Sequence, residues 1–247
     1  HIDRDPPSKQ RAERLYSKAS GDPIYPDLAF SLPKSLTVSA AQSPSDGRTV
    51  AVGVYAVESD PDTIRSYVEE IGTFVLWLLE RSYRPCLVIG DAEYDEAVRL
   101  ELQTWLEKKV PNEVVDERPN TFEELMAQLA QADLVVATRF HNVLLSLVQE
   151  KPVVSVSHMD KNEQLMAAMG LESYSLPLAN VRHQDVVARF AALEQNADQV
   201  RAVIRQKLVK RVSGQACCSV RTTVRTWQTS PMAIWRSEER RVGKECR

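Results

Sequence analysis

The amino-acid sequence predicts an α/β fold, a doubly wound parallel sheet over residues 46–212. Two observations lead to this prediction: short apolar runs rich in β-branched residues recur along this region, and stretches of helical periodicity separate them. Strands that alternate with helices of about 10–15 residues form right-handed β-α-β units, which build a parallel sheet with helices on both faces. The region contains no internal repeat, so we expect one domain.

The expected strands differ in how strongly the sequence marks them. Residues 49–57 (TVAVGVYAV) form a long β-branched run, and residues 134–138 (LVVAT) are apolar on both faces, as in a buried parallel strand. The five expected strands are residues 49–57, 86–89, 113–115, 134–138 and 152–157.

Signals at their ends mark several of the helices that connect these strands. An Asp-Pro pair at residues 60–61 is typical of a helix start, and residues 121–124 (TFEE) form a capping box. Gly170 can adopt the left-handed conformation that ends a helix, and Asn196 marks a possible break in the last helical stretch. The expected helices are residues 61–78, 95–109, 121–131, 141–149, 161–169 and 184–212.

Both ends of the chain are expected to lie outside this domain. Residues 1–45 are polar and proline-rich, which predicts a linker or the remnant of a missing N-terminal domain. From Arg201 onward twelve Lys or Arg residues stand against three acids, whereas the preceding part carries a net charge of −12. A basic arm could bind nucleic acid, but the last residues (RSEERRVGKECR) look like translated cloning or adapter sequence. We therefore expect residues 213–247 to be non-native or disordered, with Trp227 and Trp235 outside the core, and no nucleic-acid partner.

Composition and cysteine spacing argue against several classes of protein. The longest apolar run, residues 71–79, is too short for a membrane span, and the eight glycines form neither a Walker loop nor a dinucleotide fingerprint. The four cysteines have no C-x-x-C spacing, which argues against a zinc site and a disulfide framework. A charged opening without a signal peptide adds to this pattern, so we expect a cytoplasmic protein.

The most informative side chains follow residues 134–138, because ligands of an open parallel sheet bind beyond the carboxyl ends of its strands. Arg139 at a strand-to-helix junction can bind a phosphate or carboxylate through its fork, and the helix N-terminus adds N–H groups. His141 can act as a general acid, while Phe140 is expected to point into the core. The structural alternative is that Arg139 pairs with a neighbouring acid and His141 only caps the helix.

Other polar residues at strand ends give weaker signals. Lys161 opens the helix after residues 152–157 and could add positive charge to the same anion site. His158 and Asp160 form a single His-x-Asp pair, which is insufficient for a metal site, and we expect no metal and no cofactor. Three acids follow the first two strands: Glu58, Asp60 and Asp91. They could hold a cation or bind sugar hydroxyls, although N-capping of the next helix explains Asp60 better.

Residues 132–171 (ADLVVATRFHNVLLSLVQEKPVVSVSHMDKNEQLMAAMGL) resemble the polysaccharide pyruvyl transferase family. The distinctive block is a strand ending in Arg-aromatic-His, then a helix, Lys-Pro, another strand, and a lysine before a helix. The resemblance covers about residues 22–178. Relatives often carry a cationic or amide residue after the first strand, where this chain has Tyr55, and Tyr or Gly-Tyr before the lysine, where it has residues 158–160 (HMD). Three earlier stretches follow the family's order: residues 26–33 (PDLAFSLP), 87–95 (LVIGDAEYD) and 121–136 (TFEELMAQLAQADLVV).

The resemblance implies a Rossmann-like domain, the C-terminal, donor-binding half of a B-type glycosyltransferase fold. It implies an enzyme that moves the pyruvyl group of phosphoenolpyruvate onto two hydroxyls of a sugar in an exopolysaccharide, a cell-wall polymer or a lipid-linked oligosaccharide precursor, forming a ketal and phosphate. His141 and Arg139 would be the catalytic residues, and Arg139, Phe140, His141, Asn142 and Lys161 would bind substrate. A chain that lacks the acceptor half is expected to show little activity alone. Two alternatives stay open: a nucleotide-sugar-dependent glycosyltransferase of the same fold, and a non-catalytic anion- or sugar-binding remnant.

Overall fold

The computed structural model describes residues 14, 28–32, 48–56, 61–157 and 159–216. Several expectations fall outside these residues. They concern most of the N-terminal segment, the end of the chain from residue 217 with Trp227 and Trp235, and the side chains of Glu58, Asp60 and His158.

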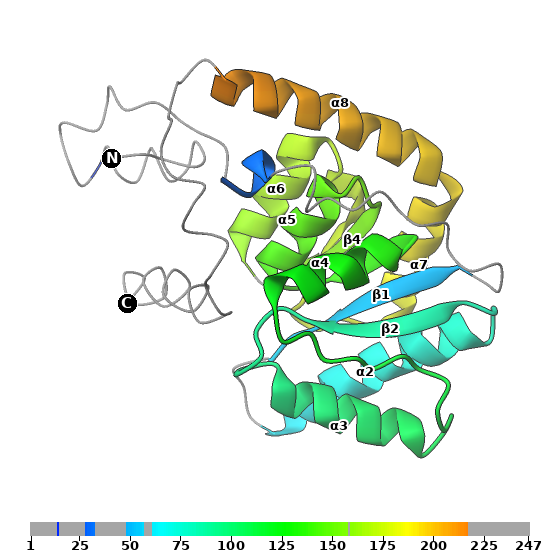
Figure 1. Cartoon of the computed structure of the whole chain (residues 1–247). Helices are drawn as coiled ribbons and strands as arrows, with labels where there is room; N and C mark the ends of the chain where they lie inside the picture. The colour runs from blue at the N-terminus through cyan, green and yellow to red at the C-terminus, as the bar shows by residue number, and fades with distance from the viewer. Residues whose placement is uncertain (1–13, 15–27, 33–47, 57–60, 158, 217–247) are drawn as a thin grey trace.

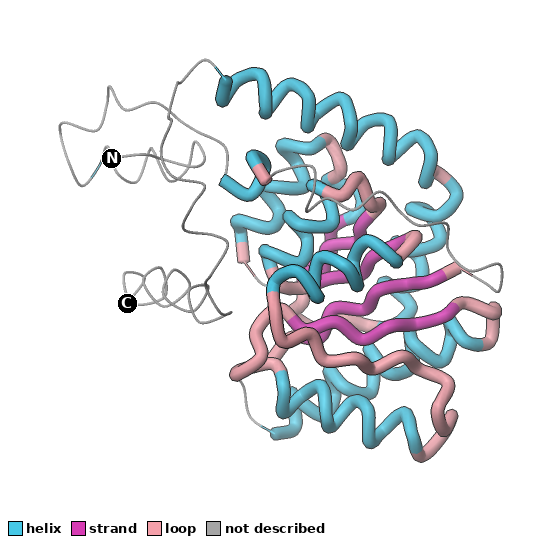
Figure 2. Tube along the Cα trace, viewed as in Figure 1, coloured by secondary structure: helices cyan, strands magenta, loops and turns pink. Residues whose placement is uncertain are grey.

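Five parallel strands form one sheet in the order β2-β1-β3-β4-β5. Figures 1 and 2 show this sheet with helices on both of its faces. Helices α2, α3 and α7 pack on one face, and α4, α5 and α6 pack on the other, so the predicted doubly wound α/β fold is confirmed. Val52 of the central strand pairs with Leu87 on one side and with Val136 on the other. The strands are β1 (Thr49–Val54), β2 (Arg84–Ile89), β3 (Leu134–Ala137), β4 (Val153–Ser157) and β5 (Ser175–Pro177).

The helices agree closely with the sequence periodicity. The capping box forms, with the Glu124 amide donating to Thr121 Oγ1 at 3.1 Å and the Thr121 amide donating to Glu124 Oε2 at 3.3 Å. Gly170 has a φ of +73° at the end of α6, and Asn196 separates the last two helices. The helices are α2 (Pro61–Leu79), α3 (Glu96–Glu107), α4 (Phe122–Gln131), α5 (Phe140–Val148), α6 (Asp160–Met169), α7 (His183–Gln195) and α8 (Ala197–Ala216), with short 3-10 turns η2 (Leu28–Ser31) and η3 (Glu172–Tyr174).

Several elements differ from the expectations, and the first strand ends at Val54, before Tyr55, although the expected strand continued to residue 57. Residues 113–115 are not a strand, because only Val115 pairs, through a single parallel bridge to Cys86 in β2. The actual fifth strand, β5, is three residues long and lacks β-branched side chains, so its sequence does not mark it. The last helix continues past the expected boundary at residue 212 and ends at Ala216.

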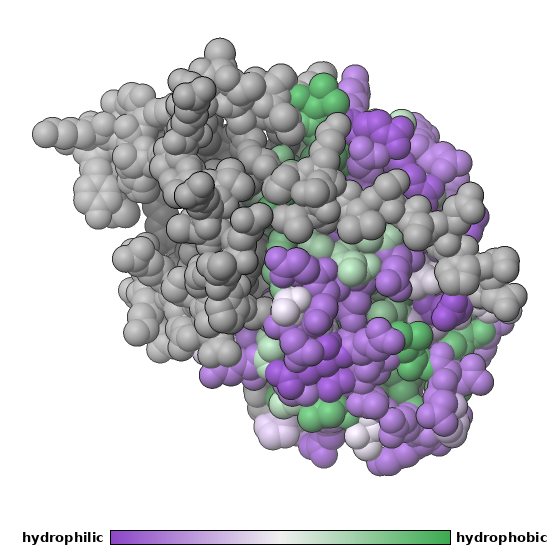
Figure 3. Space-filling model, in the orientation of Figure 1, coloured by the Kyte–Doolittle hydropathy of each residue, from purple (hydrophilic) through white to green (hydrophobic). Residues whose placement is uncertain are grey.

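Apolar side chains from the sheet and from both helix layers form one core. Fully buried examples from the two layers and the sheet include Phe74, Phe190, Leu87 and Leu144. On the face seen in Figure 3 the described surface is mostly hydrophilic, with small separate hydrophobic areas. Within the described residues, every helix falls short of the length and hydropathy that crossing a bilayer requires.

Candidate functional site at the sheet's carboxyl edge

The connections of the sheet reverse direction between β1 and β3. From β1 the chain passes through α2 to β2 on one side, whereas from β3 it passes through α5 to β4 on the other. Helices that leave in opposite directions open a crevice at the carboxyl ends of the two strands, where ligands of such sheets bind. Tyr55 follows β1 at this point and Arg139 follows β3, so the predicted position of Arg139 at the carboxyl edge is confirmed.

Arg139 forms a buried ion pair with Asp95, the residue before α3. Its Nε lies 3.0 Å from Asp95 Oδ2, and its Nη2 lies 2.7 Å from Oδ1. The Asp95 side chain is fully buried, and about a tenth of the Arg139 side chain is exposed. The fork formed by Nε and Nη2 therefore binds an acid of the protein, as the structural alternative anticipated for Arg139.

Asp95 also fixes the ends of the two neighbouring strands. The amide of Ala56 after β1 donates to Asp95 Oδ1 at 2.9 Å, and the amide of Asp91 after β2 donates to Oδ2 at 3.1 Å. One buried carboxylate thus joins the carboxyl ends of β1, β2 and β3. Five charge-assisted hydrogen bonds, from two backbone amides and from Nε and Nη2 of Arg139, compensate for the loss of its hydration.

The ring of Tyr55 lies against the face of the Arg139 guanidinium. Arg139 Cζ is 4.7 Å from the ring centroid, a cation–π distance. The Tyr55 amide donates to the hydroxyl of the buried Tyr67 at 3.2 Å, which holds the backbone of this residue. Burial raises the pKa of Tyr67 well above its usual range, so this hydroxyl stays neutral.

Gly90 lets the first turn of α5 approach the end of β2. A Cβ at this position would lie 2.9 Å from Asn142 Oδ1 and 3.0 Å from Arg139 Cγ. Asn142 is almost fully buried, yet among the residues that the structure describes neither its Oδ1 nor its Nδ2 has a hydrogen-bond partner. A buried amide without partners is costly, so a polar ligand atom or a water would be stabilised beside it.

Phe140 is half-buried and packs against the edge of the core, so the expectation that it points into the core holds only in part. Its ring packs edge-on against His141, with centroids 5.4 Å apart, and Lys161 Nζ lies 4.9 Å from its centroid. A helix turns about 100° per residue, so once Arg139 and Asn142 face inward, Phe140 and His141 lie nearer the surface. The first turn of α5 thus brings Phe140, His141 and Lys161 together.

The N-termini of α5 and α6 both lie at this edge. Arg139, the N-cap of α5, makes no capping hydrogen bond through its side chain, so the helix dipole favours an anion there. In α6, Asn162 Nδ2 donates to the Thr138 carbonyl at 2.8 Å and fixes the end of β3. Lys161 precedes Asn162, so the same hydrogen bond holds the start of α6 where Lys161 lies over the ring of Phe140.

Asp91 has a local structural role. Its Oδ1 accepts the amides of Glu93 at 2.9 Å and Tyr94 at 3.2 Å, so it stabilises the turn before α3. Among the described residues, no group of three His, Cys, Asp or Glu side chains is placed to hold a metal ion.

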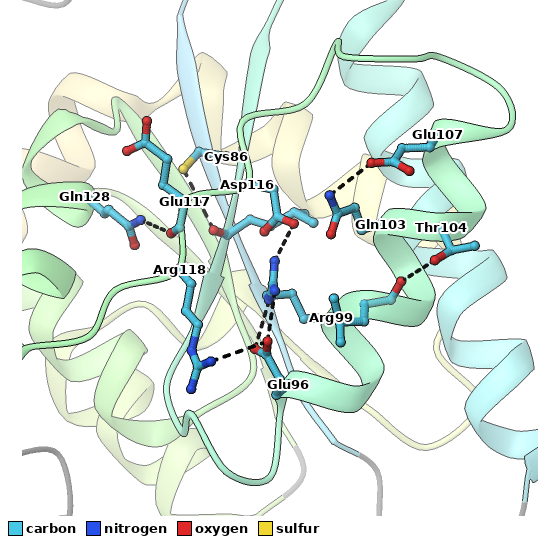
Figure 4. Close-up of polar contacts among 12 residues, drawn as sticks. Cys86, Glu96, Arg99, Gln103, Thr104, Glu107, Asp116, Glu117, Arg118 and Gln128 are labelled. Atoms are coloured by element: carbon cyan, nitrogen blue, oxygen red, sulfur yellow. Dashed lines mark hydrogen bonds and ion pairs between the residues drawn. The ribbon is translucent and has the colours of Figure 1, made fainter.

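A second buried Arg–Asp pair joins α3 to the segment after Val115, and its arginine, Arg99, lies one turn after Asp95 (Figure 4). Arg99 binds Glu96 through two hydrogen bonds of 3.0 Å and also binds Asp116, while Arg118 Nη1 lies 3.6 Å from Glu96 Oε1. Hydrogen bonds from Arg99 lower the pKa of Glu96. This network fastens the segment that follows Val115 to the start of α3, the helix that carries Asp95.

Sequence reasoning missed the residues that surround Arg139. They are Tyr55, Tyr67, Gly90, Asp95 and Asn162. One local signal existed for two of them, since Gly90 and Asp95 lie in the stretch 87–95 directly after a strand. The others lie on elements whose proximity to Arg139 depends on the strand order.

Comparisons with known proteins concern the family and the fold of this chain. The family model for polysaccharide pyruvyl transferase matches residues 4–160, and no curated protein matches the chain. A solved structure of the C-terminal domain of a glycosyl transferase group 1 family protein (LpcC) from Francisella tularensis is similar, with a TM-score of 0.50 and 10% identity over 75% of this chain and 98% of that one. UDP-GlcNAc 2-epimerase from Neisseria meningitidis, solved with UDP-GlcNAc, gives a TM-score of 0.45 and 10% identity over 69% of this chain and 42% of that one. At this identity the likeness to the first structure is one of fold, and it agrees with the expected C-terminal half of a B-type glycosyltransferase.

Proposed function

Because this chain belongs to the polysaccharide pyruvyl transferase family, we propose that the carboxyl edge around Arg139 binds phosphoenolpyruvate. The chain would supply the donor-binding half of an enzyme that transfers the pyruvyl group to sugar hydroxyls. The acceptor would be a sugar of a polysaccharide or of a lipid-linked oligosaccharide precursor. The spacing of the cysteines favours a reducing compartment, and the proposal places the reaction in the cytoplasm.

One observation supports this function most directly: the first turn of α5 gathers three groups that suit this donor. Arg139 and Lys161 are cations, and His141 is a group that can transfer a proton. Phosphoenolpyruvate carries a phosphate and a carboxylate close together, so it requires several cationic or N–H donors in one place.

The charges divide unequally among these groups. Asp95 neutralises much of the Arg139 charge at contact distance, so Arg139 contributes directed hydrogen bonds more than long-range attraction. Lys161 and the N-terminus of α5 then supply most of the attraction for the donor. Asn142, whose buried amide has no hydrogen-bond partner within the described part of the chain, would bind a polar atom of the donor beside them.

The reaction needs proton transfers, and His141 is placed to make one of them. One acceptor hydroxyl adds to C2 of phosphoenolpyruvate while its methylene carbon gains a proton and becomes a methyl group. The second hydroxyl then replaces the phosphate at C2 and closes the ketal. Of the two hydroxyl protons, one ends on carbon and the other leaves with the phosphate, so the equation balances. An imidazole donates such protons well because its pKa lies near neutrality.

A binding experiment on the full chain tests this proposal. Thermal unfolding would be followed with phosphoenolpyruvate, UDP-sugars and inorganic phosphate, each over a concentration series. A ligand at 100 times its Kd stabilises by about 2.7 kcal/mol, which is readily measured. We expect stabilisation by phosphoenolpyruvate at lower concentration than by phosphate. Stabilisation by UDP-sugars without any by phosphoenolpyruvate would instead indicate a glycosyltransferase.

A further inference from the structure

We infer that Asp95 is a positioning residue of the donor site, which fixes the orientation in which the Arg139 guanidinium meets a ligand. This inference rests on the proposed function and adds a residue to it. Asp95 itself is fully buried and would not touch the donor.

The hydrogen bonds of Asp95 make it a permanent part of the site. It accepts two hydrogen-bonding groups of Arg139 and the amides of Ala56 and Asp91. An anion that displaced it would leave a buried carboxylate and two part-buried amides without partners, at a cost larger than the gain from one new ion pair. The donor therefore does not replace Asp95, and it meets a guanidinium whose Nε and Nη2 stay bound to this carboxylate.

Two other contacts restrict the same guanidinium. The Tyr55 ring covers one face at 4.7 Å, and the backbone at Gly90 lies close to the Arg139 stem, since a Cβ there would come within 3.0 Å of Cγ. Asp95 thus fixes one edge of the Arg139 guanidinium, the Tyr55 ring covers one of its faces, and the Gly90 backbone lies against the Arg139 stem. A guanidinium held in this way forms good hydrogen bonds only with an acceptor at one position and angle.

Fixed orientation should appear as selectivity between anions. Phosphoenolpyruvate presents two anionic groups at a set distance, whereas inorganic phosphate presents one and can reorient. A fixed arginine therefore favours phosphoenolpyruvate, and a mobile one distinguishes the two ligands less well.

The test compares Asp95→Asn with Asp116→Asn in the full chain by titration calorimetry. Asp116 is a matched control, because it is another buried carboxylate paired with an arginine, Arg99, and it lies outside the donor site. We expect Asp95→Asn to weaken phosphoenolpyruvate binding about tenfold or more. The ratio between the affinities for phosphoenolpyruvate and for inorganic phosphate should become smaller. Asp116→Asn should lose thermal stability but keep both affinities.

Several results would overturn the inference. Unchanged affinities in folded Asp95→Asn would make the residue purely structural, and tighter binding of both anions would mean that it only neutralises charge. A loss of selectivity in Asp116→Asn of equal size would indicate general destabilisation. Failure of the unaltered chain to bind phosphoenolpyruvate would instead overturn the proposed function, and this inference with it.

A measurement on the unaltered chain covers the case in which Asp95→Asn does not fold. The Arg139 Nε–H signal, assigned in ¹H–¹⁵N NMR spectra by comparison with Arg139→Lys, should be protected from exchange before and after phosphoenolpyruvate is added. Loss of that protection on binding would show that the ligand displaces Asp95 and would overturn the inference.

Discussion

Lys161 at the start of α6 lies over the ring of Phe140 at the start of α5, with 4.9 Å between Nζ and the ring centroid. The two residues follow neighbouring parallel strands, β3 and β4, whose carboxyl ends meet at the same edge. A cation–π contact of this kind holds a lysine that would otherwise sample many rotamers. The contact therefore places a positive charge beside His141 before any ligand arrives.

Replacing Lys161 by Met should weaken phosphoenolpyruvate binding about tenfold, because the change removes the ammonium and keeps most of the apolar stem. Titration calorimetry of the full chain measures this change in affinity. Lys109→Met is the matched control, since Lys109 also lies over an aromatic ring, Trp105 at 4.5 Å, but follows the C-terminal end of α3, away from the donor site. Equal losses in both variants would show that Lys161 acts only through net charge.

Arg139→Lys should weaken phosphoenolpyruvate binding by about 1–3 kcal/mol, because lysine keeps the charge but cannot reproduce the planar fork that Asp95 binds. The same change should lower the free energy of unfolding, since the Asp95 carboxylate loses hydrogen bonds in a buried position. Calorimetric titration gives the first quantity and urea unfolding the second. Normal donor affinity in a destabilised variant would leave Arg139 with a structural role alone.

His141→Ala should act on turnover more than on donor binding. If the imidazole transfers a proton, the chemical step should slow by roughly 10²–10⁴-fold while phosphoenolpyruvate affinity changes little. The comparison needs an active enzyme and a full pH profile. Near-normal turnover with an unchanged profile would move the proton transfer to another group, such as His158 or a residue of the acceptor half.

Transfer activity should depend on the acceptor half. The chain alone is expected to turn over little, and its fusion to the N-terminal half of a related family member should restore phosphate release. That release must require both phosphoenolpyruvate and an acceptor sugar. Full turnover by the chain alone would show that it already contains the acceptor site.

Acid should weaken the network around Arg99. Hydrogen bonds from Arg99 lower the pKa of Glu96 from its usual value of 4.5, so this carboxylate stabilises the fold above that pH, and the stabilisation is lost as the pH falls through the lowered pKa. Unfolding by urea between pH 6 and about 3 measures the effect. Glu96→Gln should flatten this dependence, whereas Glu101→Gln, an exposed side chain of the same helix, should keep it. Identical pH dependence in both variants would contradict this assignment.

The sequence alone determined the features that depend on neighbouring residues. Apolar periodicity marked six helical stretches, the last of which forms the two helices α7 and α8, and four of the five strands. The capping box at Thr121 and the left-handed Gly170 form as expected. The position of Arg139 and His141 at the carboxyl edge also followed, because a right-handed parallel sheet places every such strand end on one side.

Only the tertiary structure decided which residues meet Arg139. Asp95 is 44 positions away along the chain and reaches Arg139 because β1, β2 and β3 end side by side. The inward or outward direction of Phe140 was likewise set by this pair, which draws Arg139 into the interior and leaves the ring between His141 and Lys161. Periodicity records whether a side chain is buried, but the partner of a buried charge depends on strand order, and strand order is a property of the whole sheet.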